Sequence, residues 1–396
     1  MKKRVIFIVV TALLCCLLVA CGSKTRLQAP QNIRQNGPFL IWDEVENAEG
    51  YIVLADNEEY VTAEPSCNLS FLGGETVYVV KIKAVGDGEN FADSDWSEFG
   101  FNEIFKYTLL ADGSGYEVNL SVSSVELQDR KVVVPSTYEN LPVTRIADKM
   151  FYKCASLTEV VLPNTLKEIG KMAFINCKAL TSIELPESVT AIGPSAFMHC
   201  SSLKKIVVPT GIERIESNMF NDCTSLTEVV LPSMLKEIRG MAFFGCIALE
   251  NIELPASVTA IGSIAFGGCS SLKKIVVPTG VERIEGSTFV GCSNLTEVVL
   301  PSTLKEIMGM AFRKCEALKT VVLPSSLEDI GKDAFYMCPL ESVFFDGTEA
   351  EFLSVSVAEG NDSILSAAVY FYSETEPTEN PQKFWRFSGG KPLPWA

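Results

Sequence analysis

Apolar and polar positions follow a unit of 23 residues that repeats over residues 151–338. Each unit opens with the spacing of Leu157, Val160 and Leu162, which predicts a short strand with one buried face. A proline such as Pro163 then ends the strand, because a residue without an N–H cannot continue the pairing. This proline recurs at Pro163, Pro186, Pro209, Pro232, Pro255, Pro278, Pro301 and Pro324.

The rest of each unit predicts a second inward-facing piece and a helical turn. Leu166 and Ile169 form the second piece, and Phe174, Cys177 and Leu180 follow at the three- to four-residue intervals of one helical side. A cysteine stands three residues after every phenylalanine of the repeat. These phenylalanines are Phe151, Phe174, Phe197, Phe220, Phe243, Phe266, Phe289, Phe312 and Phe335.

A fixed period of this length predicts a solenoid, because a unit so small buries its apolar face only by stacking on its neighbours. The run that starts at Leu157 recurs at Leu226 and Leu295, so blocks of three units have been duplicated. The predicted fold is mainly β with short helical turns, a solenoid of 23-residue coils with a parallel sheet on one face, preceded by a small β-sandwich.

Over residues 131–346 this pattern resembles the BspA-type, or treponemal, leucine-rich repeat. It differs from the commoner leucine-rich repeat because proline replaces the asparagine ladder after the strand. The resemblance implies a surface protein of a bacterium, and several relatives are implicated in adhesion. We predict the solenoid over 107–346, a cap over 347–372, and a linker with an aromatic tail over 373–396.

The predicted cap contains a short helix within 349–368 and a closing strand over 369–372. An open sheet edge invites aggregation, so a terminal coil has to be covered. The aromatic run 384–387 is expected to pack on this cap.

The first 20 residues form a signal peptide, with Lys2, Lys3 and Arg4 ahead of an apolar stretch that is short for a membrane span. The run 18–21, Leu-Val-Ala-Cys, resembles the bacterial lipobox. That resemblance implies a diacylglycerol on Cys21, an acylated amino terminus and a short linker over 21–26. The alternative is an ordinary secretory peptide or an uncleaved anchor. Both place the remaining chain outside the cytoplasm.

Residues 27–103 lack the period and predict short strands separated by turns. They resemble a fibronectin type III domain, a small β-sandwich. Trp42 and Tyr78 are expected in its core, with Tyr78 as a candidate tyrosine corner. The residues that carry the resemblance are Pro30, Trp42, Tyr51, Leu72, Tyr78 and Trp96.

The net charge of −16 argues against nucleic acid as a partner, because phosphate binding needs clustered Lys and Arg. Loss of the signal peptide leaves 30 basic and 49 acidic side chains, a charge of −19. Such acidity favours solubility and a monomer.

The residue types predict no enzyme, no cofactor and no metal site. His199 is the one histidine, which excludes His-dependent triads and most imidazole metal sites, and we expect it in an exposed loop. The nine cysteines of the repeat and Cys67 are expected to be buried free thiols, with disulfides as the alternative.

One column of strand residues is expected to face outward and to bind an extracellular or surface protein. The alternative is that valine stands there only for its β-propensity. A second hypothesis is carbohydrate attachment through the sandwich, or through Trp385 and Trp395, and a third is a structural spacer without a ligand. The column comprises Val161, Glu184, Val207, Val230, Glu253, Val276, Val299, Val322 and Phe344.

Overall fold

The computed structural model describes residues 24–36, 39–55, 58–68, 79–100, 105–121, 131–389 and 391–395. The predictions for the signal peptide, Cys21, Leu72 and Tyr78 lie outside these ranges. Within them, no helix is both long enough and apolar enough to cross a bilayer.

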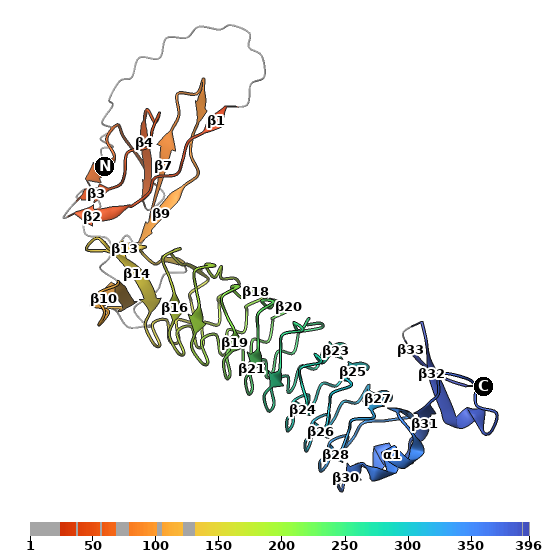
Figure 1. Cartoon of the computed structure of the whole chain (residues 1–396). Helices are drawn as coiled ribbons and strands as arrows, with labels where there is room; N and C mark the ends of the chain where they lie inside the picture. Colours follow the sequence, from red (N-terminus) through yellow and green to blue (C-terminus); the bar gives the residue numbers. More distant parts are fainter. Residues whose placement is uncertain are drawn as a thin grey trace.

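The N-terminal module consists of two antiparallel sheets that share one core (Figure 1). Trp42 and Tyr51 lie in that core with their ring centroids 5.2 Å apart, packed edge to face. Its sheets run β2-β3-β6 and β5-β4-β7-β9, and β1 pairs with β8. The strands are β1 Thr25–Arg26, β2 Arg34–Asn36, β3 Phe39–Ile41, β4 Gly50–Ala55, β5 Glu58–Thr62, β6 Ser66–Asn68, β7 Val79–Val85, β8 Phe91–Ala92 and β9 Ser97–Gly100.

The repeat forms the predicted solenoid, and its first strand row starts each coil (Figure 1). All pairs within this row are parallel, but the row is broken into short sheets instead of one continuous sheet. The coils that carry Glu184 and Glu253 contribute no strand to this row, and the first of them forms only a single bridge, between Ser182 and Lys205. The row comprises β12 Lys131–Val133, β15 Glu159–Val161, β18 Lys205–Val207, β20 Glu228–Val230, β23 Lys274–Val276, β25 Glu297–Val299, β27 Thr320–Pro324 and β29 Ser342–Asp346.

A second row of parallel strands follows the proline corner of each coil. It uses the Leu166–Ile169 piece, and Ile169 is fully buried while Glu168 before it is not. The row comprises β14 Leu141–Ile146, β16 Glu168–Ile169, β17 Ala191–Ile192, β19 Arg214–Ile215, β21 Glu237–Ile238, β22 Ala260–Ile261, β24 Arg283–Ile284, β26 Glu306–Ile307, β28 Asp329–Ile330 and β30 Ser356–Val357.

The third side of each coil is a run of hydrogen-bonded turns around the phenylalanine, where we expected a helical turn. The N–H groups of these turns donate either to a carbonyl of the same coil or to a carbonyl of the next coil. Cys177 N–H donates to Phe174 O at 3.1 Å, and Phe174 N–H donates to Ala196 O at 2.8 Å. The residues two before and two after each phenylalanine have a left-handed backbone, as at Ser195 (φ 57°) and His199 (φ 61°). Two such residues let the turns follow one another without forming a helix.

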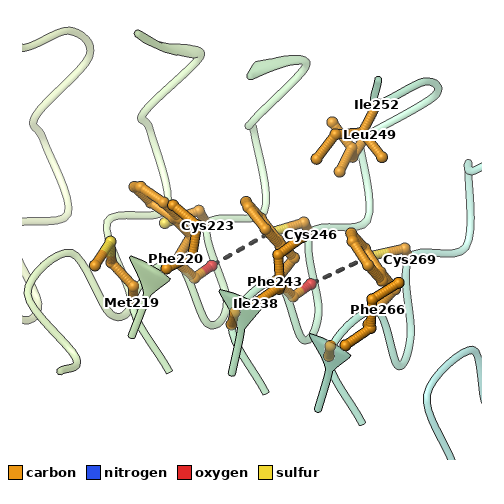
Figure 2. Packing of buried hydrophobic residues seen from close by; sticks show 14 of the residues in the cluster. Met219, Phe220, Cys223, Ile238, Phe243, Cys246, Leu249, Ile252, Phe266 and Cys269 are labelled. Carbon is orange, nitrogen blue, oxygen red and sulfur yellow. Dashed lines mark hydrogen bonds between the residues drawn. The ribbon is translucent and has the colours of Figure 1, made fainter. Parts of the chain in front are cut away.

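The phenylalanines form one continuous stack through the solenoid. All nine rings are fully buried, and neighbouring centroids lie 5.0–5.7 Å apart with nearly parallel planes. Figure 2 shows Phe220, Phe243 and Phe266 with the cysteines beside them. This spacing is slightly larger than the roughly 4.8 Å between paired strands, so the rings stack in step with the backbone of neighbouring coils.

The N-terminal end of the second row is covered by a hairpin that we did not predict. Its strands are β10 Phe105–Leu109 and β11 Tyr116–Leu120, and β11 pairs with β14. Tyr107 of the hairpin stacks on Tyr138 of β13 (Thr137–Tyr138), with ring centroids 4.0 Å apart. The hairpin therefore closes the first coil with an aromatic cluster.

The C-terminal cap differs in detail from the prediction. In place of one helix there are two, α1 Glu349–Ser354 and α2 Asp362–Ser366, with β30 between them. The closing strand is β31 Ala368–Tyr372, and the tail returns as η3 Pro381–Lys383, β32 Phe384–Ser388 and β33 Lys391–Pro394. As expected, the aromatic run packs on the cap: β32 pairs with β31, and Trp385 is fully buried.

We predict that Phe243→Ala lowers the free energy of unfolding by about 3–5 kcal/mol, because it removes one ring from the middle of a closely packed stack. Chemical denaturation monitored by circular dichroism measures this change. Phe387→Ala is the matched control, since that ring is 53% exposed. Equal effects of the two substitutions would contradict the central role of the stack.

Candidate functional site

Four valines of the predicted column are exposed and lie in two adjacent pairs. Val207 pairs with Val230 across β18 and β20, and Val276 pairs with Val299 across β23 and β25. Their exposed fractions are 41–47%. The residue before each of these valines in its strand points inward, because side chains alternate along a strand. These four valines and their neighbours on the first strand row are called the strand face.

Charged side chains border each valine pair. Lys205 and Glu228 form an ion pair at 2.7 Å beside the first pair, and Lys274 and Glu297 form one at 2.6 Å beside the second. Glu253 is exposed in the coil that separates the two pairs. The strand face therefore presents two apolar sites, each next to a neutral Lys–Glu pair, in a spacing that follows the three-coil duplication. We had not predicted these ion pairs.

The ends of the predicted column are less accessible than its middle. Val161 and Val322 are half-buried, while Glu184 is exposed. Phe344 is only 5% exposed, so its assignment to an exposed face is wrong. The Tyr370 ring stacks on the Phe344 ring with centroids 5.1 Å apart. The Trp385 ring, from the returning tail, packs edge to face against Phe344 with centroids 5.5 Å apart.

The tail is also a poor platform for sugar stacking. Trp385 is fully buried and donates its indole N–H to Phe345 O at 2.9 Å, so its predicted role as a platform is wrong. Arg386 covers a face of Trp395, with its guanidinium 3.9 Å from the ring centroid. In the sandwich, Trp96 is 37% exposed and Lys83 Nζ lies 5.2 Å from its ring centroid.

Family comparison identifies the repeat. The model described as the BspA type leucine-rich repeat region matches residues 144–250 and 238–356, in six copies. The matched ranges cover more than half of the 396 residues. The chain belongs to the BspA-type leucine-rich repeat family. A search of curated proteins finds no match.

Solved structures of similar chains include three bacterial proteins. The leucine-rich repeat protein of T. pallidum is 34% identical, and the match covers 54% of this chain and 88% of that one, with a TM-score of 0.42. A leucine-rich cell surface protein from Faecalibacterium prausnitzii is 23% identical over 66% and 98% of the two chains, with a TM-score of 0.40. The pneumococcal vaccine antigen PcpA is 18% identical over 71% and 91%, with a TM-score of 0.39.

The part of the chain that the structure describes holds no group of side chains arranged to bind a metal ion. No cluster of three or more His, Cys, Asp or Glu side chains could hold a metal ion there. His199 is partly exposed at a left-handed turn position, and its Nδ1 lies 3.3 Å from a carboxylate oxygen of Asp222. An open groove lies near the N-terminal hairpin and is lined in part by Arg145. The guanidinium of Arg145 forms ion pairs with carboxylate oxygens of Glu117 at 3.1 Å and of Glu168 at 3.3 Å, so its charge is already balanced.

The cysteines of the BspA-type coils are buried free thiols, and each described one from Cys177 to Cys338 donates a hydrogen bond to the coil before it. Cys246 Sγ lies 3.2 Å from Phe220 O, and Cys269 Sγ lies 3.1 Å from Phe243 O (Figure 2). A small apolar side chain with a weak donor thus satisfies a buried carbonyl. The sequence spacing had indicated burial but not this bond.

A hydrogen bond with the Cys315 side chain lowers the pKa of Cys338, whereas burial makes the thiols from Cys154 to Cys292 poor nucleophiles. Burial raises the pKa of Cys200 and of Cys269 from 9.0 to about 12, because a thiolate loses its hydration inside the core. The native protein therefore keeps these protons between roughly pH 9 and 12, whereas the unfolded chain releases them. Stability contributed by these groups is present below pH 9 and is lost as the pH rises.

Above pH 9 the free energy of unfolding should fall with rising pH, and we predict that this fall is smaller in Cys269→Ser by about 1.4 kcal/mol per pH unit. The reason is that serine removes one proton that the native state keeps and the unfolded state releases. Denaturant titrations of both proteins at a series of alkaline pH values measure the two slopes. Serine also offers a donor to Phe243 O, which limits the change at neutral pH. Parallel slopes would contradict the assignment.

Proposed function

We propose that this protein is a lipid-anchored bacterial cell-surface protein that binds a protein partner through the strand face. The observation that supports binding is the pair of exposed valine sites, at Val207 with Val230 and at Val276 with Val299. Exposed apolar groups placed at a regular spacing on a rigid array offer matching contacts to a second protein surface. Adhesion is the role that this arrangement fits best.

The proposed partner has two apolar contact points with polar surroundings. Three coils separate Val207 from Val276, which corresponds to about 14 Å at the spacing of paired strands. The Lys205–Glu228 and Lys274–Glu297 ion pairs border these points without adding net charge. Affinity would then come from apolar contact, and the ion pairs would restrict the orientation of the partner.

Anchoring is proposed through Cys21, the cysteine of the lipobox-like run. Several acyl chains hold a protein stably, because each buried methylene contributes about 0.8 kcal/mol. The sandwich follows the anchor directly in sequence, so we propose that this fibronectin-type module spaces the solenoid from the membrane.

We expect the triple variant Val207→Lys, Val230→Lys and Val276→Lys to reduce partner capture at least tenfold, because an unpaired ammonium group would have to be buried at each contact. Binding of the lipid-free protein to purified host matrix proteins, measured by surface plasmon resonance, tests this. The circular dichroism spectrum should stay unchanged, since all three side chains are exposed. Val61→Lys, at a valine that is 77% exposed in the sandwich, is the control. Capture that survives the triple variant places the site elsewhere.

Labelling with radioactive palmitate in a bacterial host tests the anchor. We expect label on the native chain and none on Cys21→Ala, because the modification requires that sulfur. The variant should also remain unprocessed by the lipoprotein signal peptidase. Equal labelling of both chains would rule out Cys21 as the anchor.

A further inference from the structure

The turn side of the solenoid carries an apolar patch that the proposed function does not use. Its centre is Gly267, where an added Cβ would lie 2.7 Å from Ile264 Cγ2 and 3.1 Å from both Phe244 Cδ2 and Val290 Cγ1. Met241 is 38% exposed and Ile247 49% exposed on the coil before. Together these side chains are called the Gly267 patch: Met241, Phe244, Ile247, Ile264 and Val290.

Most of the Gly267 patch was not copied by the three-coil duplication, although Met241 recurs as Met172 and Met310. The position of Ile264 is occupied by Ser195 one block earlier and by Asp333 one block later. The position of Ile247 is occupied by Lys178 and by Glu316 in the same two blocks. The strand face, by contrast, repeats the same run at residues 157, 226 and 295. The apolar residues Ile247 and Ile264 are therefore specific to their coils.

The backbone conformation makes Ile264 an unfavourable residue for its position. Its φ is 60°, and a β-branched side chain in this left-handed region is destabilising by about 1–2 kcal/mol. Ser195 and Asp333 hold the same conformation, at φ 57° each. Ile264 is also partly exposed, so its own burial offsets only part of this cost. A surface that covers Ile264 would account for an isoleucine here.

Charge is absent from the patch and present at its two ends. The turn segments 240–248, 262–271 and 286–294 contain no charged residue, although the chain as a whole carries −16. Two coils before Phe266 stands Asp222, and two coils after it stands Lys314. Both residues occupy the same place in their coils, two positions after the phenylalanine, with φ values of 55° and 61°.

We propose that the Gly267 patch binds a second copy of this chain in an antiparallel, face-to-face dimer. A two-fold axis that lies in the interface and crosses the solenoid at the coil of Phe266 superposes the patch on itself. The same axis places Asp222 of each copy opposite Lys314 of the other, which forms two intermolecular ion pairs. Two acidic chains can approach here because the contact itself is neutral.

The contact is small, which makes the dimer a transient one. Four coil spacings lie between Asp222 and Lys314, so the contact is about 20 Å long at about 5 Å per coil. A stable interface uses about 20–30 residues on each partner, and the five side chains of the patch with the two charged residues fall well below that number. The monomer expected from net charge alone is therefore in equilibrium with the dimer. With the proposed anchor at Cys21, the two N-termini lie at opposite ends, so the dimer would join two facing membranes.

Sedimentation velocity tests the proposal on the chain that lacks its first 21 residues, over the micromolar to sub-millimolar range. The native chain should show a concentration-dependent dimer, and Ile264→Asn should weaken it at least tenfold. Asparagine suits the left-handed position, so thermal unfolding should show that the variant folds. Val207→Asn on the strand face is the control and should leave dimerisation unchanged. A native chain that stays monomeric, or a dimer that Ile264→Asn does not weaken, overturns the proposal.

A charge exchange tests the antiparallel register. Asp222→Lys and Lys314→Asp should each weaken the dimer several-fold at low salt, and the double variant should restore it, because each ion pair then re-forms with its charges reversed. The chain already uses both residue types at this turn position, so the fold tolerates the exchange. Failure of the double variant to recover overturns the antiparallel register. The triple valine variant should still dimerise, so failure here and failure of partner capture are distinguishable.

Discussion

Contact between neighbouring coils is the interaction on which the whole solenoid depends. A coil of 23 residues cannot enclose a core of its own, so its phenylalanine is buried only because rings lie above and below it. The ring spacing of 5.0–5.7 Å is close to, and slightly larger than, the separation of paired strands. Backbone bonds, stacked rings and cysteine donors therefore all act between one coil and the next. The same dependence explains why both ends carry caps, with the hairpin at one end and Trp385 at the other.

Contacts between coils constrain the inward-facing residues, whereas the outward-facing residues can vary from coil to coil. Duplication of three-coil blocks copied the inward residues and the strand face together, which produced the two valine pairs at a regular spacing. On the turn side the same backbone carries Ser195, Ile264 or Asp333 at one position. The two surfaces thus suit the different roles that we propose for them: partner binding along the repeated face, and contact with a second copy at one local patch.

The prediction was most accurate where contacts are local in sequence or repeat with the period. The buried phenylalanines, the thiols and the proline corners all followed from spacing. The hairpin at 105–120 was missed, although its strands alternate and Asp112-Gly113 stands at the turn. Phe344 was placed on the open face because its own coil has the right spacing. Trp385, which covers it, lies far along the chain and outside the repeat.

The sequence by itself determined the coil, its core and its family, because each of these depends on residue types at short and constant intervals. Only the tertiary structure decided which parts of the surface are open. That question depends on contacts that the repeat itself does not contain: the tail over Phe344, and the side chains that meet over Gly267. A periodic pattern contains no information on such contacts, since they form where the period ends or where one copy departs from the others.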